Sequence, residues 1–110
     1  MEKLKFQDGQ RCFKVGGGVL RFNPSDPGLY SRFLAAAEAL EQLQPEDVGQ
    51  ADRKLREELG RVFPGNDFDA MFPGSLLSLC ENDKLLVQNF LEALEPVLIA
   101  GARRYAEAGM

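Results

Sequence analysis

An apolar run near the end of the chain, between residues 85 and 99, constrains the fold more than any other feature. Its apolar residues repeat with the spacing of an amphipathic helix, but the stripe is unusually wide. The members are Leu85, Leu86, Val87, Phe90, Leu91, Leu94, Val97, Leu98 and Ile99. One neighbouring element cannot cover such a stripe. We therefore expect a long helix, from about Lys84 to Tyr105, that is either central in the fold or shared with another chain.

The ends and the middle of this helix carry their own signals. Asn82 or Asp83 is expected to cap its first turn, because a short polar side chain can accept from the unpaired amides there. Pro96 has no amide to donate to the Glu92 carbonyl, so we expect a kink at that point.

An aromatic segment bounded by helix breakers precedes this run, from Pro64 to Gly74. It predicts one short turn of helix, from Asp67 to Phe72, with its apolar side chains on one side. Aromatic residues at helical spacing are usually buried, so one interpretation is that the turn closes the end of the core. The other is that it is an exposed anchor for a partner protein.

Two candidate partner-binding surfaces follow from these elements. The first is the aromatic segment with the leucines after it, and the second is the late part of the final helix. The candidate residues are Phe68, Met71, Phe72, Leu76, Leu77, Val97 and Ile99. Sequence alone leaves open whether they are exposed or belong to the core.

The N-terminal residues alternate as a β-hairpin does. With a two-residue turn at Asp8-Gly9, four apolar side chains share one face. These are Leu4, Phe6, Phe13 and Val15. Gly16-Gly17-Gly18 lacks the Lys and Ser/Thr of a phosphate loop, so we interpret it as a turn. A further run, 19–22, could add a third strand to a small meander.

Two helices are expected between the strands and the aromatic segment. Ser25 or Asp26 would cap the first, with Pro27 at its first position, and Pro45 would end it. The apolar positions of the first are Leu29, Phe33, Ala36, Leu40 and Leu43. Acidic residues at 46–47 open the second. Its apolar positions are Val48, Leu55, Leu59, Val62 and Phe63.

The second helix also carries charges at ion-pair spacing. Asp52 with Arg56, and Glu57 with Arg61, are four residues apart, and we interpret both pairs as part of an exposed face. Taken together, the elements predict an α+β fold in one domain, 1–110. A small antiparallel hairpin or meander (1–22) would pack against about four helices (26–107), the last of them long and kinked.

Composition narrows the functional classes. The 110 residues include 13 basic and 17 acidic ones, a net charge of −4, which argues against nucleic acid as a partner. No segment approaches the roughly 20 apolar residues that cross a bilayer, and the N-terminus does not resemble a signal peptide. We expect a cytoplasmic protein without a membrane partner, in which Cys12 and Cys80 are free thiols.

Catalytic chemistry is poorly supported. The chain has no histidine, which removes the commonest general base and the commonest metal ligand. Asp67 and Asp69 form the one close carboxylate pair outside a regular helix, and helix capping explains Asp67 better than catalysis does. We expect no catalytic residue, no metal site and no cofactor.

Short motifs in the second half resemble a known family. They are Ala51–Leu59, then Phe63-Pro64-Gly65, Phe68–Gly74 with its second Phe-Pro-Gly, and Asn89–Leu94. In this order, after an N-terminal hairpin, they resemble small prophage proteins of Gram-positive bacteria that look like siphophage tail assembly chaperones. The chain departs from the commoner pattern at Pro64 and Pro73, where a glycine more often follows each phenylalanine.

The resemblance implies a non-enzymatic protein that binds a tail protein such as the tape measure protein and shields it during tail assembly, often as a homo-oligomer. The alternatives are a structural subunit of a phage tail or head–tail junction, or a small oligomeric interaction domain. An enzyme that uses carboxylates such as Asp67 and Asp69 is the least favoured.

Overall fold

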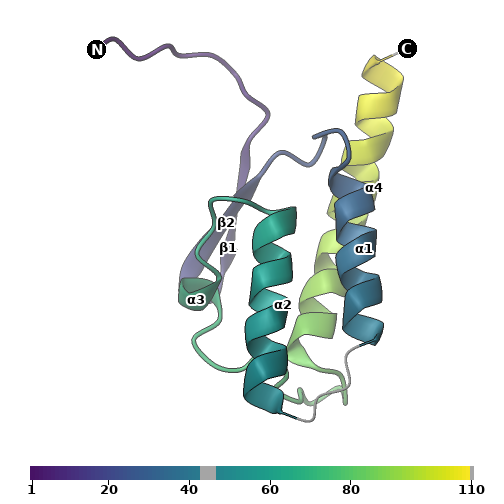
Figure 1. The fold of residues 1–110 in the computed structure, drawn as a ribbon. Helices are drawn as coiled ribbons and strands as arrows, with labels where there is room; N and C mark the ends of the chain where they lie inside the picture. The colour runs from purple at the N-terminus through teal and green to yellow at the C-terminus, as the bar shows by residue number, and fades with distance from the viewer. Residues whose placement is uncertain (43–46, 110) are drawn as a thin grey trace.

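A computed structural model of the chain describes residues 1–42 and 47–109 (Figure 1). The elements in chain order are β1 (Arg11–Val15), β2 (Gly18–Phe22), α1 (Leu29–Glu41), α2 (Val48–Val62), α3 (Phe68–Met71) and α4 (Leu86–Ala108). This is the expected α+β arrangement, a two-stranded antiparallel hairpin with four helices of which the last is the longest. Helix α1 packs on α2 and α4, whereas α3 packs on α2 and on β2.

The hairpin turns at a different place from the one predicted. β1 pairs with β2 through a turn at Gly16-Gly17, with Phe13 opposite Leu20. The prediction of a hairpin turn at Asp8-Gly9 with a strand before it is wrong, since residues 1–10 form no strand. Leu4 and Phe6 alternate as well as Phe13 and Val15 do, so the sequence pattern alone could not choose between the two hairpins.

Two of the three glycines, Gly16 and Gly18, are required by packing against α3. Gly16 has a positive φ of 55°, and a Cβ there would overlap the carbonyl oxygen of Met71. A Cβ on Gly18 would lie 2.9 Å from the backbone nitrogen of Met71. Side chains at these positions would push the hairpin away from α3, so the glycines serve close approach of two backbones.

The first helix begins later than predicted. Residues before it form consecutive turns, in which the Asn23 carbonyl accepts from the Asp26 amide at 3.1 Å and the Asp26 carbonyl from the Leu29 amide at 3.2 Å. Gly28, with φ of 82°, is then the residue that precedes α1, and no side chain caps the helix. The predicted capping by Ser25 or Asp26, with Pro27 at the first position, is therefore wrong.

The second helix begins near the predicted place, but Asp47 caps it from the preceding position and its first turn contains no acidic residue. The Asp47 carboxylate accepts from the Gly49 amide at 2.9 Å and caps α2. Of the predicted stripe, Val48 is 54% exposed and does not belong to the core, because it lies in the first turn. The predicted positions Leu43, Pro45 and Glu46 lie outside the described residues.

The final helix begins without the predicted cap. Asp83 adopts a left-handed turn conformation, with φ of 62°, and the Asn82 side chain pairs with that of Asn89 at 2.9 Å. The first turn is instead held by the Gln88 side chain, whose oxygen accepts from the Leu85 amide at 2.8 Å. From there the helix continues through Pro96 to its end at Ala108.

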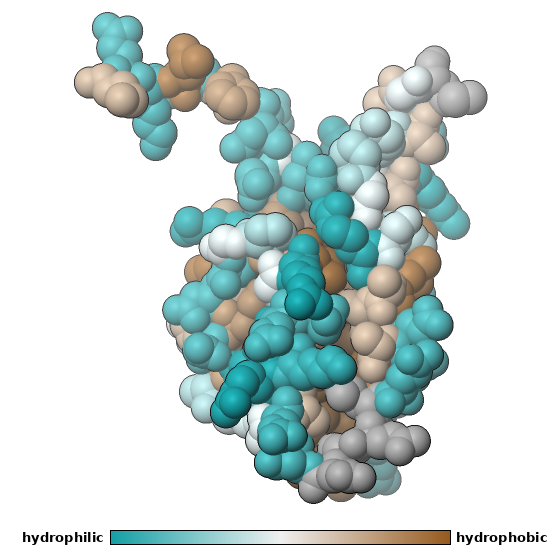
Figure 2. Space-filling model, viewed as in Figure 1, coloured by the Kyte–Doolittle hydropathy of each residue, from teal (hydrophilic) through white to brown (hydrophobic). Residues whose placement is uncertain are grey.

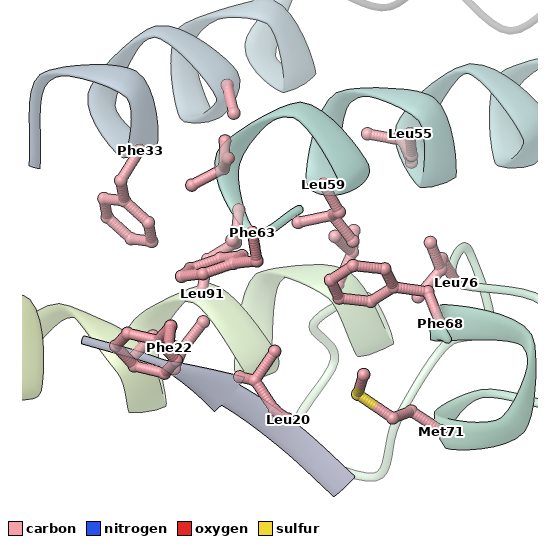
Figure 3. Close-up of a cluster of buried hydrophobic side chains, with 14 of the residues drawn as sticks. Leu20, Phe22, Phe33, Leu55, Leu59, Phe63, Phe68, Met71, Leu76 and Leu91 are labelled. Carbon is pink, nitrogen blue, oxygen red and sulfur yellow. The ribbon is translucent and has the colours of Figure 1, made fainter. Parts of the chain in front are cut away.

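The core lies between the hairpin, the three longer helices and the aromatic segment (Figure 3). Phe63, which ends α2, is 1% exposed and sits at its centre. Its ring centroid lies 4.9 Å from that of Phe22 and 6.5 Å from that of Phe68. Strand β2, helix α2 and the short helix α3 therefore pack together around the Phe63 side chain.

Candidate protein-binding surface

The first candidate surface is part of the core. Exposure is 5% for Phe68, 2% for Met71, 7% for Phe72 and 0% for Leu76. Leu77 is half-buried against the same cluster. These side chains are occupied within the chain, so the structure supports the interpretation that the aromatic segment closes the core.

One arginine of α2 holds this segment in place. The Arg56 guanidinium donates to the Phe68 carbonyl at 3.2 Å, to the Asp69 carboxylate at 2.9 Å and to the Gly74 carbonyl at 2.6 Å. The Asp52 carboxylate accepts from Arg56 at 2.9 Å and from the Leu76 amide at 2.8 Å. We refer to the contacts of Asp52 and Arg56 as the Arg56 clamp. It fixes the aromatic segment at its middle, Phe68 and Asp69, and at its C-terminal end, Gly74, so the buried position of the segment does not depend on apolar packing alone.

The interpretation of these charges as an exposed face was wrong. Only 17% of the Arg56 side chain and 21% of the Asp52 side chain are exposed. The other predicted pair is not formed as expected, since Arg61 pairs with Glu58 three residues before it. The spacing of Asp52 and Arg56 was a correct guide to their contact, but it could not show that a distant loop would cover them.

The two carboxylates considered for catalysis have structural partners. Asp67 caps α3, accepting at 3.1 Å from the amides of Asp69 and Ala70, as predicted. Asp69 belongs to the Arg56 clamp. Within residues 1–42 and 47–109, no cluster of three or more metal-ligating side chains is present.

The second candidate surface lies on the C-terminal half of α4. Val97 and Ile99 are half-buried, and residues 102–109 are exposed where the helix extends beyond α1 (Figure 1). This half is anchored at Gly101, where a Cβ would overlap the carbonyl of Pro24. Before Gly101 the helix packs against the rest of the molecule, whereas residues 102–109 after it are exposed to solvent.

Hollows flank this part of the helix on two sides. The larger, of about 1000 Å³, lies between α4 and the start of the hairpin, and we refer to it as the notch. Its helix wall includes Pro96, Val97, Ala100 and Tyr105. A shallower hollow of about 490 Å³ continues past Pro96 over Ile99, with Glu92 and Glu95 at one end and Arg103 at the other. The helix thus presents small and apolar residues between charged ends.

Residues 7–11 form the opposite side of the notch, and we refer to residues 1–10 as the arm. Figure 2 shows the arm and the end of α4 as two separate projections of the molecule. Leu4 is 84% exposed and Phe6 is 76% exposed, while Tyr105 on the facing helix is 49% exposed. Sequence reasoning missed this surface because it assigned Leu4 and Phe6 to a hairpin.

Cys12 is an exposed free thiol and Cys80 a half-buried one. In the part of the chain that the structure describes, no helix is long and apolar enough to cross a membrane.

Comparisons with known proteins do not assign a family. A scan against family models, a search of curated proteins and a search of solved structures each returned no match.

Proposed function

We propose that this protein is a non-enzymatic phage tail assembly chaperone, or a related morphogenesis factor, that binds a tail protein such as the tape measure protein. The proposal rests on the family resemblance of the motifs between residues 51 and 94. A second support is the surface on the C-terminal half of α4, where half-buried Val97 lines the notch and half-buried Ile99 lines the shallower hollow.

The observation that carries the proposal is the exposed position of this helix end. A long amphipathic partner segment could lie along it and cover the apolar residues, as helices do in open grooves. The charged residues at the ends of the shallower hollow would set its direction. Phe68, Met71, Phe72 and Leu76 are buried in the core and would not touch the partner.

The test is co-expression with a candidate siphophage tape measure protein. We expect the soluble fraction of that partner to rise, and the two proteins to purify together. The variant Ile99→Asp, which places a charge in the shallower hollow, should abolish both effects. Leu34→Asp is the matched control, because Leu34 is 47% exposed on α1 and does not line either hollow. Absence of any effect with the unmodified chain would contradict the proposal.

A structural subunit of the tail or head–tail junction is the second candidate function. The hairpin supports it, because β2 is covered by α3 and by Asn66, whose side chain accepts from the Arg21 amide at 2.7 Å and donates to the Arg21 carbonyl at 2.9 Å. β1 is the outer strand, and Cys12 and Lys14 on it are exposed. Its edge could pair with another copy. Rings of fixed copy number in electron micrographs of the purified protein would favour this candidate over the chaperone.

We also propose that the chain has no enzymatic activity. The support is that Asp67 and Asp69, the carboxylates considered for chemistry, are used in capping and in the Arg56 clamp. An activity found in a substrate screen and abolished by Asp67→Asn together with Asp69→Asn, with the fold retained, would overturn this.

A further inference from the structure

The hairpin has an open edge on the outer side of β1, and we refer to it as the β1 edge. On the other side of the hairpin, β2 is covered by α3 and by the Asn66 side chain, which accepts from the Arg21 amide at 2.7 Å. β1 pairs with β2, and among the described residues no backbone hydrogen bond from outside the hairpin reaches it. An open strand edge is a template for a further strand.

The register of the hairpin shows which backbone groups of β1 are free. Val15 and Gly18 flank the two-residue turn and lie opposite each other, so they form the hydrogen-bonded pair that closes the hairpin. Hydrogen-bonded pairs recur at every second residue of an antiparallel ladder, so Phe13 also bonds to β2. The amides and carbonyls of Cys12 and Lys14 therefore point away from β2. These are the groups that an added strand would bind.

The charges of the hairpin indicate the sign of the partner. Residues 11–22 hold three of the chain's 13 basic residues and none of its 17 acidic ones. The three, Arg11, Lys14 and Arg21, are exposed, and none of them forms an ion pair in the part of the chain that the structure describes. Arg21 lies opposite Cys12, so it shares one face of the hairpin with Lys14. Acidic side chains of an added strand would be attracted to that face.

The other face of the β1 edge is apolar and incompletely covered. Phe13 and Val15 on β1 are half-buried against the core. The Phe13 ring centroid lies 5.3 Å from that of Phe22 and 5.0 Å from the Arg11 guanidinium. Leu20 and Phe22 on β2, by contrast, are at most 5% exposed. Side chains on adjacent strands cover one another, so apolar residues of an added strand would complete the cover of β1.

We infer that the β1 edge binds an extended segment of a partner protein in which acidic and apolar residues alternate. The segment lies antiparallel to β1 as a third strand, which is the more stable direction of pairing. Its acidic side chains lie beside Lys14 and Arg21, and its apolar side chains lie beside Phe13 and Val15. A second copy of this chain is a less suitable occupant, because it would bring another basic hairpin against the first.

The first test is an NMR titration of the full chain with a short blocked peptide of alternating glutamate and valine. Without peptide, the amides of Cys12 and Lys14 should exchange with solvent much faster than that of Phe13. Saturating peptide should slow their exchange at least about tenfold, because they become hydrogen-bonded. The same peptide with lysine in place of glutamate should not bind. Equal binding of the two peptides, or no binding of either, would overturn the inference.

The same measurement tests the competing occupants. If exchange at Cys12 and Lys14 slows as the protein alone is concentrated, a second copy fills the β1 edge and the inference is wrong. It is also wrong if a short single-stranded oligonucleotide binds these residues more tightly than the glutamate–valine peptide does, because the basic hairpin would then be a nucleic-acid surface.

Variants at position 12 test pairing through the backbone. Cys12→Pro removes an outward amide and keeps the bonds to β2, since proline is tolerated on the free side of an edge strand. It should weaken binding of the glutamate–valine peptide at least about tenfold. Cys12→Ser is the matched control, because it keeps the amide, and it should bind as the unmodified chain does. Equal binding by the two variants, each with an unchanged circular dichroism spectrum, would overturn the inference.

Variants of the basic residues test the charges, and they do not alter the backbone. Lys14→Gln with Arg21→Gln should weaken binding of the glutamate–valine peptide at least about threefold at low salt. The matched control is Arg53→Gln with Lys54→Gln, which removes two exposed charges from α2 and should leave binding unchanged. Equal effects of the two double variants would contradict the inference. These tests use neither the α4 surface nor a tail protein, so they and the co-expression test can fail separately.

Discussion

The aromatic segment after α2 and the exposed end of α4 share an apolar character but differ in how the chain uses it. The first is held through the Arg56 clamp by contacts to the Phe68 and Gly74 carbonyls, and its Phe68, Met71 and Phe72 side chains are at most 7% exposed. The second is anchored at Gly101 and extends into solvent beyond it. Apolar composition therefore predicts neither burial nor binding by itself, and polar contacts to the backbone decide which segment becomes core.

The largest expected difference between the two regions concerns their aromatic residues. Phe63→Ala should lower the free energy of unfolding by about 3–5 kcal/mol, because it leaves a cavity where strand, helix and short turn meet. Tyr105→Ala removes an aromatic side chain that is 49% exposed and should cost about 0.5 kcal/mol or less at dilute protein. Urea unfolding followed by circular dichroism measures both. Equal losses would mean that the end of α4 is packed as tightly as the core.

Loss of the Arg56 clamp is expected to have the next largest effect on the free energy of unfolding. Arg56→Met should cost about 2–4 kcal/mol, since it removes the Arg56 hydrogen bonds to the Phe68 and Gly74 carbonyls and leaves the partly buried Asp52 carboxylate without its counter-charge. Arg61→Met is the matched control, because the Arg61 side chain is 71% exposed and its ion pair with Glu58 is on the surface. Thermal unfolding of the two variants compares them directly, and a clamp variant as stable as the control would show that apolar packing alone holds the segment.

A smaller loss is expected at the hairpin turn. Gly16→Ala should cost about 1–3 kcal/mol, because φ is positive there and the new Cβ meets the Met71 carbonyl. Gly74→Ala has open space around the added Cβ and should change stability by less than about 0.5 kcal/mol. Both are measured by chemical unfolding. If the first variant unfolds like the second, the contact between the hairpin and α3 is loose.

The smallest effect is expected for the ion pair at the start of α4. Lys84 and Glu92 lie 2.8 Å apart with about half of each side chain exposed. Glu92→Gln should change the free energy of unfolding by less than about 0.5 kcal/mol, and the difference should shrink further in 1 M salt. A loss near that of Arg56→Met would contradict the distinction between clamped and exposed charges.

Periodic patterns in the sequence were sufficient to predict most of the helical part. The stripes of Leu55, Leu59 and Val62, and of Val87, Leu91 and Leu98, are buried as expected, and Asp67 caps the short helix. These features depend on residues within a few turns of one another. The α+β class followed from them.

The errors arose where contacts join distant residues. The sequence could not show that Met71 would lie against Gly16, or that Leu76 would donate to Asp52, because such contacts depend on the finished packing. The same limit affected the candidate surface. Phe68 and Ile99 look equally suitable as anchors in sequence, and only the Arg56 clamp separates them.

Hydrogen exchange of backbone amides tests this separation most directly. The Phe72 amide donates to the Phe68 carbonyl and the Leu76 amide to Asp52, so both should exchange as slowly as the core amide of Leu59, which requires global unfolding. Amides of residues 102–109, near the free end of α4, should exchange much faster. Rapid exchange at Phe72 and Leu76 would contradict the account, because the aromatic segment would then open by itself and could serve as the partner-binding surface.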